Sequence, residues 1–405
     1  MKEGWQTKPL ADICEVFVDG DWIESKDQSP NGIRLIQTGN VGEGIFKDRA
    51  EKARYISDAT FNRLRCTEIY EGDCLISRLP DPVGRSCILP NTEERMITAV
   101  DCTIVRFNQK QAIPEFFNFY SQSLDYLEAV EAETTGTTRK RISRSKLGQI
   151  LIPVPPLPEQ QRIVGILDEA FDGIATAKAN AEQNRQNARA LFESHLQSVF
   201  TQRGEGWVEK PLADLCDQAR VITYGVIKLG DEVSDGVPCL RTSNVRWLRI
   251  DTDGMKRIAP SLSAEFARTI LKGGEVLVNV RGTLGGVSVA TPEMIGWNVS
   301  REVAVVPVDS SRINPFYLTY WIGSGVSQQW LSGVKKGAAY VGINIEDLRL
   351  LPVKAPKLEM QLEVVRHLEE LHDETQRLES IYQQKRAALD ELKKSLLHRA
   401  FTGQL

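Results

Sequence analysis

The sequence has no long hydrophobic run and few residues of the kinds that bind metal ions. No stretch approaches the roughly 20 uncharged apolar residues of a membrane-spanning helix, and the first residues, MKEGWQTKPLADIC, lack the apolar core of a signal peptide. Only four histidines are present, and none stands four residues from another, as in helical metal sites. We therefore expect a cytoplasmic protein without a metal centre.

Paired cysteines are also missing. The seven cysteines are an odd number, contain no CxxC pair and are scattered through segments that largely have a β-strand pattern. Such cysteines are expected to be buried free thiols in a reducing compartment, and neither disulfides nor a zinc site is indicated.

The common catalytic motifs are absent as well. There is no GxxxxGK[ST] phosphate loop, no GxGxxG after a predicted strand, and no Asn/Asp-Pro-Pro-aromatic motif of amino-methyltransferases. Because every histidine lies in a segment with a helical pattern, no Ser/His/Asp arrangement is indicated. We expect a chain that catalyses no reaction and binds no cofactor itself.

The composition is that of a globular protein with more than one domain. The 405 residues are 41% hydrophobic and 26% charged, which predicts two or three domains with proper cores. The net charge of −4 argues against general coating of nucleic acid. Any binding of phosphates must therefore depend on locally clustered Lys and Arg.

An internal repeat covers the whole chain. GWQTKPLADIC at 4–14 and GWVEKPLADLC at 206–216 share eight identities in eleven positions at an offset of 202. The offset holds within a few residues further on, because EGDCLIS (71–77) corresponds to GGEVLVN (273–279) and Phe200-Thr201 to Phe401-Thr402. The chain therefore consists of two copies of one sequence unit.

Each copy begins with mixed structure and ends in a long helix. The first 150 or so residues of a copy combine β-type stretches, Gly/Pro/Asn turns and one helical patch, which predicts an α+β domain. A proline-rich exit then leads into a long helical pattern. We expect globular domains over 1–156 and 203–356, and long helices over 157–202 and 357–405.

The two long helices have a heptad pattern in the same register. Apolar positions alternate in steps of four and three, 201 residues apart in the two copies. The seam includes Ile163, Leu167, Ile174, Asn184 and Leu191 in the first helix, and Val364, Leu368, Leu378, Lys385 and Leu392 in the second.

This pattern predicts an antiparallel coiled coil within the chain, with pseudo-two-fold symmetry. Asn184 and Lys385 stand near the middle of the seam and would set its register. Helices of about 42 residues would span about 60 Å at 1.5 Å per residue, the length of a spacer. The alternative is that each helix packs on its own globular domain.

A basic segment and its counterpart are the main candidates for contacting DNA. TTGTTRKRISRSK at 134–146 contains five cations and no acid, and its glycine and threonines would let a backbone approach phosphates. Its candidate contacts are Thr137, Thr138, Arg139, Lys140, Arg141 and Arg144. The second copy offers Lys335, Lys336 and Tyr340. The alternative is a solvated basic loop.

Two further pairs of polar segments stand at matching positions. RLIQTGN and RTSNVR offer Gln37, Thr38 and Asn40, and Arg241, Ser243, Asn244 and Arg246. Asn and Gln can bind adenine edges, but they also build turns. SRLPDPVGRS and NVRGTLGGVS offer Arg78 and Arg85, and Arg281 and Thr283, on Gly/Pro turns whose glycines are structural.

These motifs together resemble the specificity subunit of type I restriction-modification systems over the entire chain. The resemblance is carried by the repeated GWxxKPLADxC starts, the GDCLISRLPDPVGRS and GEVLVNVRGTLGG segments, the GTTRKRIS loop and IPVPPLPEQQRIVGILD. It implies two target-recognition domains that each read one half of a bipartite double-stranded DNA site. The second helix departs from the pattern, because LEMQLEVVRHLEEL replaces its Pro-Glu-Gln opening.

The resemblance also implies partners. Two modification subunits would carry S-adenosylmethionine chemistry, and restriction subunits would use ATP and Mg, all assembled around the helices. A scaffold whose coiled coil recruits partners without reading DNA is the alternative. A self-contained restriction-modification enzyme would need catalytic motifs that this sequence lacks.

Overall fold

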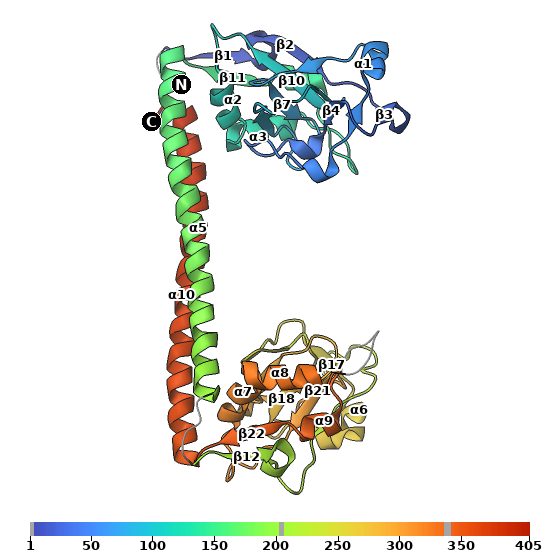
Figure 1. Cartoon of the computed structure of the whole chain (residues 1–405), viewed down its shortest axis with the longest axis vertical. Coiled ribbons are helices and arrows are strands. Elements are labelled where there is room, and N and C mark those ends of the chain that lie inside the picture. The colour runs from blue at the N-terminus through green and yellow to red at the C-terminus, as the bar shows by residue number, and fades with distance from the viewer. Residues whose placement is uncertain (1–3, 202–205, 336–341) are drawn as a thin grey trace. The chain divides into compact units, whose positions relative to one another are not determined.

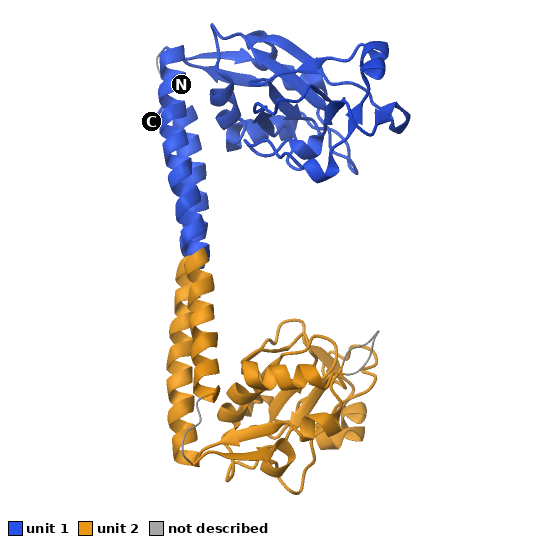
Figure 2. Cartoon of the chain, viewed as in Figure 1, with its two compact units in different colours: residues 1–182, 383–405 blue, residues 183–382 orange. Residues whose placement is uncertain are grey.

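The computed structural model describes residues 4–201, 206–335 and 342–405 (Figure 1). The chain divides into two compact units, shown in Figure 2. Unit 1 contains residues 1–182 and 383–405, and unit 2 contains residues 183–382. Each unit therefore combines one globular domain with part of both long helices.

The centre of unit 1 is a four-stranded antiparallel sheet in the order β2 (Cys14–Asp19), β10 (Cys102–Phe107), β7 (Cys74–Ser77), β8 (Ser86–Ile88). Its strands alternate between two apolar faces. Cys74, Ile76 and Val105 belong to the core that includes the helices, whereas Leu75 and Ile104 belong to the core beneath a second sheet. Both faces are covered, which explains why apolar residues stand at consecutive positions in β7 and β10.

The second sheet of unit 1 has five short strands. Its order is β3 (Gln28–Ser29), β5 (Tyr55–Ile56), β4 (Ile33–Ile36), β9 (Met96–Thr98), β6 (Glu68–Ile69), with β4 and β9 parallel. The remaining elements are β1 (Gln6–Pro9), paired with β11 (Leu151–Val154), and the helices α1 (Asp58–Leu64), α2 (Pro114–Tyr120), α3 (Leu124–Ala132) and α4 (Arg144–Gly148).

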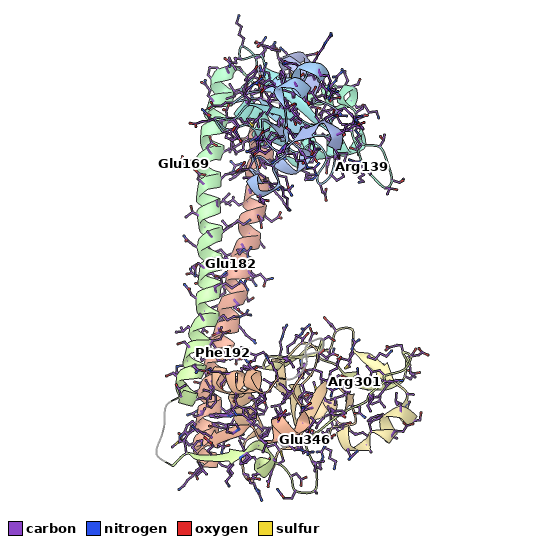
Figure 3. All side chains as sticks on the ribbon, turned by 45° about the vertical axis from the view of Figure 1, so that its right-hand side comes forward. Arg139, Glu169, Glu182, Phe192, Arg301 and Glu346 are labelled. Atoms are coloured by element: carbon purple, nitrogen blue, oxygen red, sulfur yellow. The ribbon has the colours of Figure 1, made fainter. Side chains whose placement is uncertain are left out.

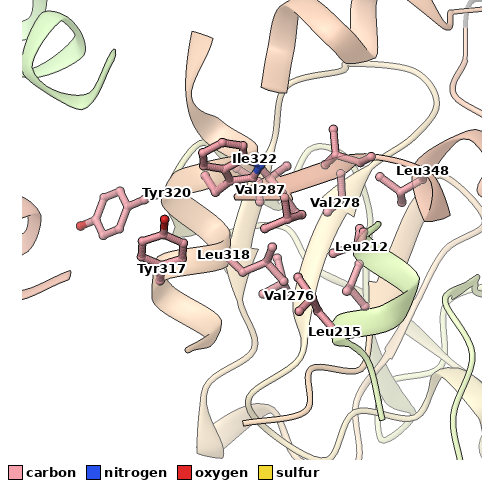
Figure 4. Packing of buried hydrophobic residues seen from close by; sticks show 14 of the residues in the cluster. Leu212, Leu215, Val276, Val278, Val287, Tyr317, Leu318, Tyr320, Ile322 and Leu348 are labelled. Atoms are coloured by element: carbon pink, nitrogen blue, oxygen red, sulfur yellow. The ribbon is translucent and has the colours of Figure 1, made fainter. Parts of the chain in front are cut away.

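Unit 2 repeats this arrangement with smaller sheets. Its strands form the sheets β13-β21-β18-β19, β17-β14-β20, β12-β22 and β15-β16. Their bounds are β12 (Val208–Pro211), β13 (Thr223–Tyr224), β14 (Val237–Leu240), β15 (Val245–Arg246), β16 (Arg249–Ile250), β17 (Lys256–Ile258), β18 (Val276–Asn279), β19 (Val287–Val289), β20 (Asn298–Val299), β21 (Val303–Val306) and β22 (Pro352–Ala355). The helices are α6 (Pro260–Glu265), α7 (Pro315–Gly323), α8 (Gly325–Gly333) and α9 (Ile345–Arg349). Figure 4 shows α7 packed on β18 in the core of this unit.

Local sequence explains how corresponding helices begin. α2 and α7 start with a proline, whose fixed φ and missing N–H suit the first turn of a helix. Ser123 and Ser324, 201 residues apart, cap α3 and α8 by accepting a hydrogen bond from the backbone N–H three residues on.

The two long helices, α5 (Leu157–Thr201) and α10 (Leu358–Phe401), pack against each other in opposite directions within each unit. In unit 1, Ile163 near the start of α5 shares a core with Leu397 near the end of α10. In unit 2, Leu196 near the end of α5 shares a core with Leu368 near the start of α10. The predicted antiparallel pair is confirmed, and the helix ends also pack on the globular domains, which was the alternative prediction.

Part of the predicted seam is wrong. Ile163, Leu167, Ile174 and Leu368 are buried, and Val364 and Leu378 are half-buried, as expected for seam positions. Asn184 and Lys385, however, are exposed, as are Leu191 (66%) and Leu392 (46%).

Near the helix ends, packing against the globular domains determines which face of each long helix is buried. In α5 the buried residues become Phe192, Leu196 and Phe200, which are spaced by four and belong to the core of unit 2. A straight helix drifts by about 20° per heptad from a strict seam, which allows this rotation. Interhelical ion pairs stand where the register-setting polar pair was predicted: Lys178–Asp390 and Arg386–Glu182, each at 2.5 Å, in unit 1, and Arg189–Glu379 at 3.2 Å in unit 2.

All seven cysteines are free thiols, and six of them are buried. Within the described residues, no helix is both long enough and apolar enough to cross a membrane. The same residues contain no group of three or more potential His, Cys, Asp or Glu metal ligands.

Candidate nucleic-acid interface

The first part of the basic segment of unit 1, residues 135–141, is a small hairpin loop, and Arg144 and Lys146 lie in the first turn of α4. Thr135 and Arg141 exchange backbone hydrogen bonds of 2.9 and 2.8 Å, and the chain turns at Gly136 with a φ of +101°. A Cβ at Gly136 would stand 2.5 Å from the carbonyl oxygen of Arg139, so only glycine fits. Buried Ile142 anchors the loop to the domain, and Thr137 and Thr138 at its tip are exposed.

Three acids surround these cations in the folded protein, although the segment itself contains none. Arg139 and Arg141 pair with Asp101 at 3.5 and 3.0 Å, Lys140 pairs with Glu131, and Lys146 pairs with Glu133 at 3.0 Å. Figure 3 shows Arg139 at the periphery of the globular domain, where its side chain is 73% exposed. Such exposed pairs contribute only about 0–1 kcal/mol, so a phosphate or a base edge can replace the carboxylate.

The corresponding segment of unit 2 is attached in the same way. Ile343 donates its backbone N–H to the carbonyl of Val280 at 2.8 Å, as Ile142 does to that of Arg78 at 3.3 Å. Lys335 is exposed at the start of the segment. Lys336 and Tyr340 lie outside the described residues.

In the second pair of segments, the two asparagines hold loops together. The side-chain oxygen of Asn40 accepts the backbone N–H of Gln37 at 2.9 Å, and its amide donates to the carbonyls of Lys47 and Asp48. Asn244 repeats this, accepting from Arg241 at 3.0 Å and donating to Asp251 at 2.9 Å. Their amides are used inside the domain, so we withdraw Asn40 and Asn244 as base-contacting candidates.

The neighbours of these asparagines remain accessible to a ligand. Ser243 and Arg246 are exposed, whereas Gln37 and Thr38 are half-buried. Arg241 is also half-buried, and its guanidinium donates to the carbonyl of Gly254 at 2.8 Å.

In the third pair, the two arginines of unit 1 are buried, which corrects their assignment to DNA. Arg78 is 3% exposed, donates to the carbonyl of Val100 at 2.6 Å and pairs with Asp19 at 3.2 Å. Arg85 is 8% exposed and donates to backbone carbonyls on all three nitrogens of its guanidinium. Burial lowers the pKa of both guanidinium groups.

The candidates of unit 2 in this pair are more accessible. Arg281 lies over the ring of Tyr224, 5.7 Å from its centroid. Thr283 is exposed and lines a cavity of about 510 Å³ together with Arg246 and with Gln197 of α5. The structure therefore brings two separate sequence candidates, Arg246 and Thr283, to one hollow.

A basic cavity in unit 1 was missed from the sequence. It has a volume of about 400 Å³ and is lined by Arg34, Gln37, Arg49, Lys52 and Arg54, among others. The last three cations are exposed. KDRAEKAR at 47–54 contains two acids among its four cations and so did not stand out as a basic segment. In the structure Arg34 is buried against Asp48 and Glu94, and Arg49, Lys52 and Arg54 line the cavity.

Comparison with known proteins identifies this architecture. The family model described as the type I restriction modification DNA specificity domain matches residues 2–184 and again 204–385. The chain belongs to this family. The two matches assign one DNA specificity domain to each half of the repeat.

Individual relatives agree with the family assignment. The type I restriction enzyme EcoBI specificity subunit of Escherichia coli is 28% identical over 71% of this chain, and the match spans 65% of that relative. The putative type I restriction enzyme MjaX specificity subunit of Methanocaldococcus jannaschii is 20% identical over 100% of this chain and 94% of its own length.

Solved structures share the fold of the whole chain. A chain from a structure on complex assembly and conformational transition of a type I R-M system aligns with a TM-score of 0.79 at 19% identity, covering 100% of this chain and 99% of that one. The HsdS subunit from Thermoanaerobacter tengcongensis aligns with a TM-score of 0.62 at 19% identity, covering 100% of this chain and 98% of its own. At this identity the likeness establishes the α+β architecture with paired long helices.

Proposed function

We propose that this chain is the non-catalytic subunit that reads a bipartite DNA sequence for a type I restriction-modification complex, with one half-site for each globular domain. The observation that carries this proposal is that two copies of one fold present different polar groups at equivalent positions. Unit 1 has Gln37 and Gly42 where unit 2 has Arg241 and exposed Arg246. Two domains that share one fold but expose different polar side chains are suited to recognising two different DNA sequences.

In unit 1 we propose that the hairpin at 135–141 provides the main contacts. Arg139 and Arg141 can bind guanine bidentately, because their partner Asp101 holds them only through exposed ion pairs. The exposed cations of the basic cavity, Arg49, Lys52 and Arg54, would hold phosphates. In unit 2 the corresponding candidates are Ser243, Arg246, Arg281, Thr283 and Lys335.

We propose that the partner subunits dock on the long helices. Apolar side chains are exposed along both helices, among them Leu191, Leu362, Ile381 and Leu392. Exposed apolar groups of this size on a helix pair favour further helices as partners. Two modification subunits would bring S-adenosylmethionine, and restriction subunits would bring ATP and Mg, so this chain itself would bind none of these cofactors.

The test is to express the chain with its modification subunits and map methylated adenines on host DNA by long-read sequencing. A bipartite motif with an unspecified gap is expected. A salt-dependent mobility shift specific for duplexes carrying that motif should accompany it. Complex formation without methylation and without a specific shift would favour the scaffold alternative.

A further inference from the structure

Arg85 connects two loops of unit 1 through backbone carbonyls. Its Nε donates to Val41 at 2.7 Å and its Nη2 donates to Thr38 at 2.8 Å. Its Nη1 donates to Leu79 at 2.7 Å and to Pro82 at 2.9 Å. One buried side chain therefore joins the loop at 37–41 to the loop at 79–83.

Unit 2 makes the same connection from another position. By strand register, Gly286 takes the position of Arg85: the carbonyl of Arg85 accepts the backbone N–H of Ser77, and that of Gly286 accepts the backbone N–H of Asn279. Glycine has no side chain that could donate. Instead Asn279, which is 1% exposed, donates through Nδ2 to Val245 at 3.0 Å, to Thr242 at 3.3 Å and to Thr283 at 3.0 Å.

The carbonyls that are bound in the first loop correspond in the two units. Thr242 and Val245 each stand 204 residues after Thr38 and Val41. Buried carbonyls without a donor cost free energy, so both copies need a donor at this place. What the two copies share is the capping of these carbonyls and not the residue that caps them.

We propose that Arg85 and Asn279 are equivalent positioning residues, each of which fixes a candidate DNA-reading loop, 37–41 in unit 1 and 241–246 in unit 2, against the neighbouring loop of its own unit. This inference rests on the proposed function. In unit 1 the joined loops include Gln37 and Thr38, and in unit 2 they include Ser243 and Thr283. Neither Arg85 nor Asn279 touches DNA itself, because both side chains are buried behind the loops they join.

The local space allows the two solutions to be exchanged. A Cβ at Gly286 would stand 2.3 Å from the Nδ2 of Asn279, so glycine is required beside the asparagine. The corresponding position in unit 1 is Arg85 itself, so an asparagine at 77 needs a glycine at 85. Ser77 corresponds to Asn279, and the pair S77N/R85G therefore builds the clamp of unit 2 into unit 1.

The experiment uses the complex of the full chain with its modification subunits. Plasmid libraries carry the methylation motif of the unaltered complex with one half-site randomised at a time, and long reads report which bases permit methylation. We expect Arg85→Gly to relax base preference about ten-fold in the half-site of unit 1 alone, because small displacements of contacting groups cost this much or more. We expect S77N/R85G to restore the preference, and Asn279→Ser to relax only the other half-site.

Each outcome decides the question. Unchanged base preference in Arg85→Gly and in Asn279→Ser would overturn the inference, and so would equal relaxation of both half-sites. Failure of S77N/R85G to restore either specificity or solubility would overturn the equivalence of the two clamps. Absence of any bipartite motif with the unaltered chain would instead overturn the proposed function, so the two failures are distinguishable.

Discussion

Replacing Arg139 and Arg141 with alanine tests how unit 1 reads DNA. Both guanidinium groups share the carboxylate of Asp101 at 3.5 and 3.0 Å, and both are well exposed, so leaving that carboxylate costs at most about 1 kcal/mol for each pair. A bidentate contact between arginine and guanine contributes about 1–3 kcal/mol of discrimination. If both arginines read bases, the double variant should lose about 2–6 kcal/mol of binding to the cognate half-site, less at most about 2 kcal/mol for the two ion pairs with Asp101 that the bound state gives up.

The assay is equilibrium binding by the complex to duplexes with single base changes in either half-site, at several salt concentrations. Base reading predicts a loss confined to particular base pairs of one half-site. Equal weakening on every duplex, with the salt slope reduced by about 0.9 for each arginine, would refute base reading and leave phosphate contacts. Asp101→Asn should act in the opposite direction and strengthen binding, because it removes a charge that competes with DNA.

A matched control is available at the far end of the same strand. Asp101 directly precedes β10, and Lys110 follows the end of that strand. The six residues of this strand extend about 20 Å. Exposed Lys110, changed to alanine, should alter the salt slope by less than either arginine.

Three further predictions concern the stability of the two units and the length of the long helices. Gln160 is fully buried and forms hydrogen bonds with Ile113, Gln111 and Pro155. Changing it to alanine should lower the free energy of unfolding, measured in urea, by about 2–4 kcal/mol, whereas the same change at its exposed neighbour Gln161 should lower it little. Equal effects would show that these hydrogen bonds do not hold α5 to its domain. Burial lowers the pKa of His372 below 6.5, so the unfolded chain binds its proton more readily and unit 2 should lose stability as the pH falls below about 6.5; a pH dependence unchanged in His372→Gln would contradict this. Lengthening α5 and α10 by one turn each adds about 5.4 Å, and at about 3.4 Å per base pair the gap in the methylated motif should grow by one or two base pairs; an unchanged gap would show that helix length does not set it.

The sequence by itself determined the repeat, the two α+β domains and the paired long helices. These features depend on local properties: identical segments 202 residues apart, proline-marked exits, and apolar residues in steps of three and four. The equivalent strands and helices of the two units follow the same repeat, from the glycine-tryptophan starts to the buried helix ends.

Only the tertiary structure decided which polar residues can reach a ligand. Arg85 and Arg139 stand in similar glycine-containing segments, yet Arg85 is buried among backbone carbonyls and Arg139 is exposed. The difference arises because Arg85 directly precedes β8, which pairs with β7 inside the domain, whereas Arg139 lies in the exposed turn of the hairpin closed by Thr135 and Arg141. Tertiary packing also determines the ion pairs of Asp101 and Glu131 and the exposure of Leu191. The contacts of these residues come from distant segments and do not follow from the local sequence pattern.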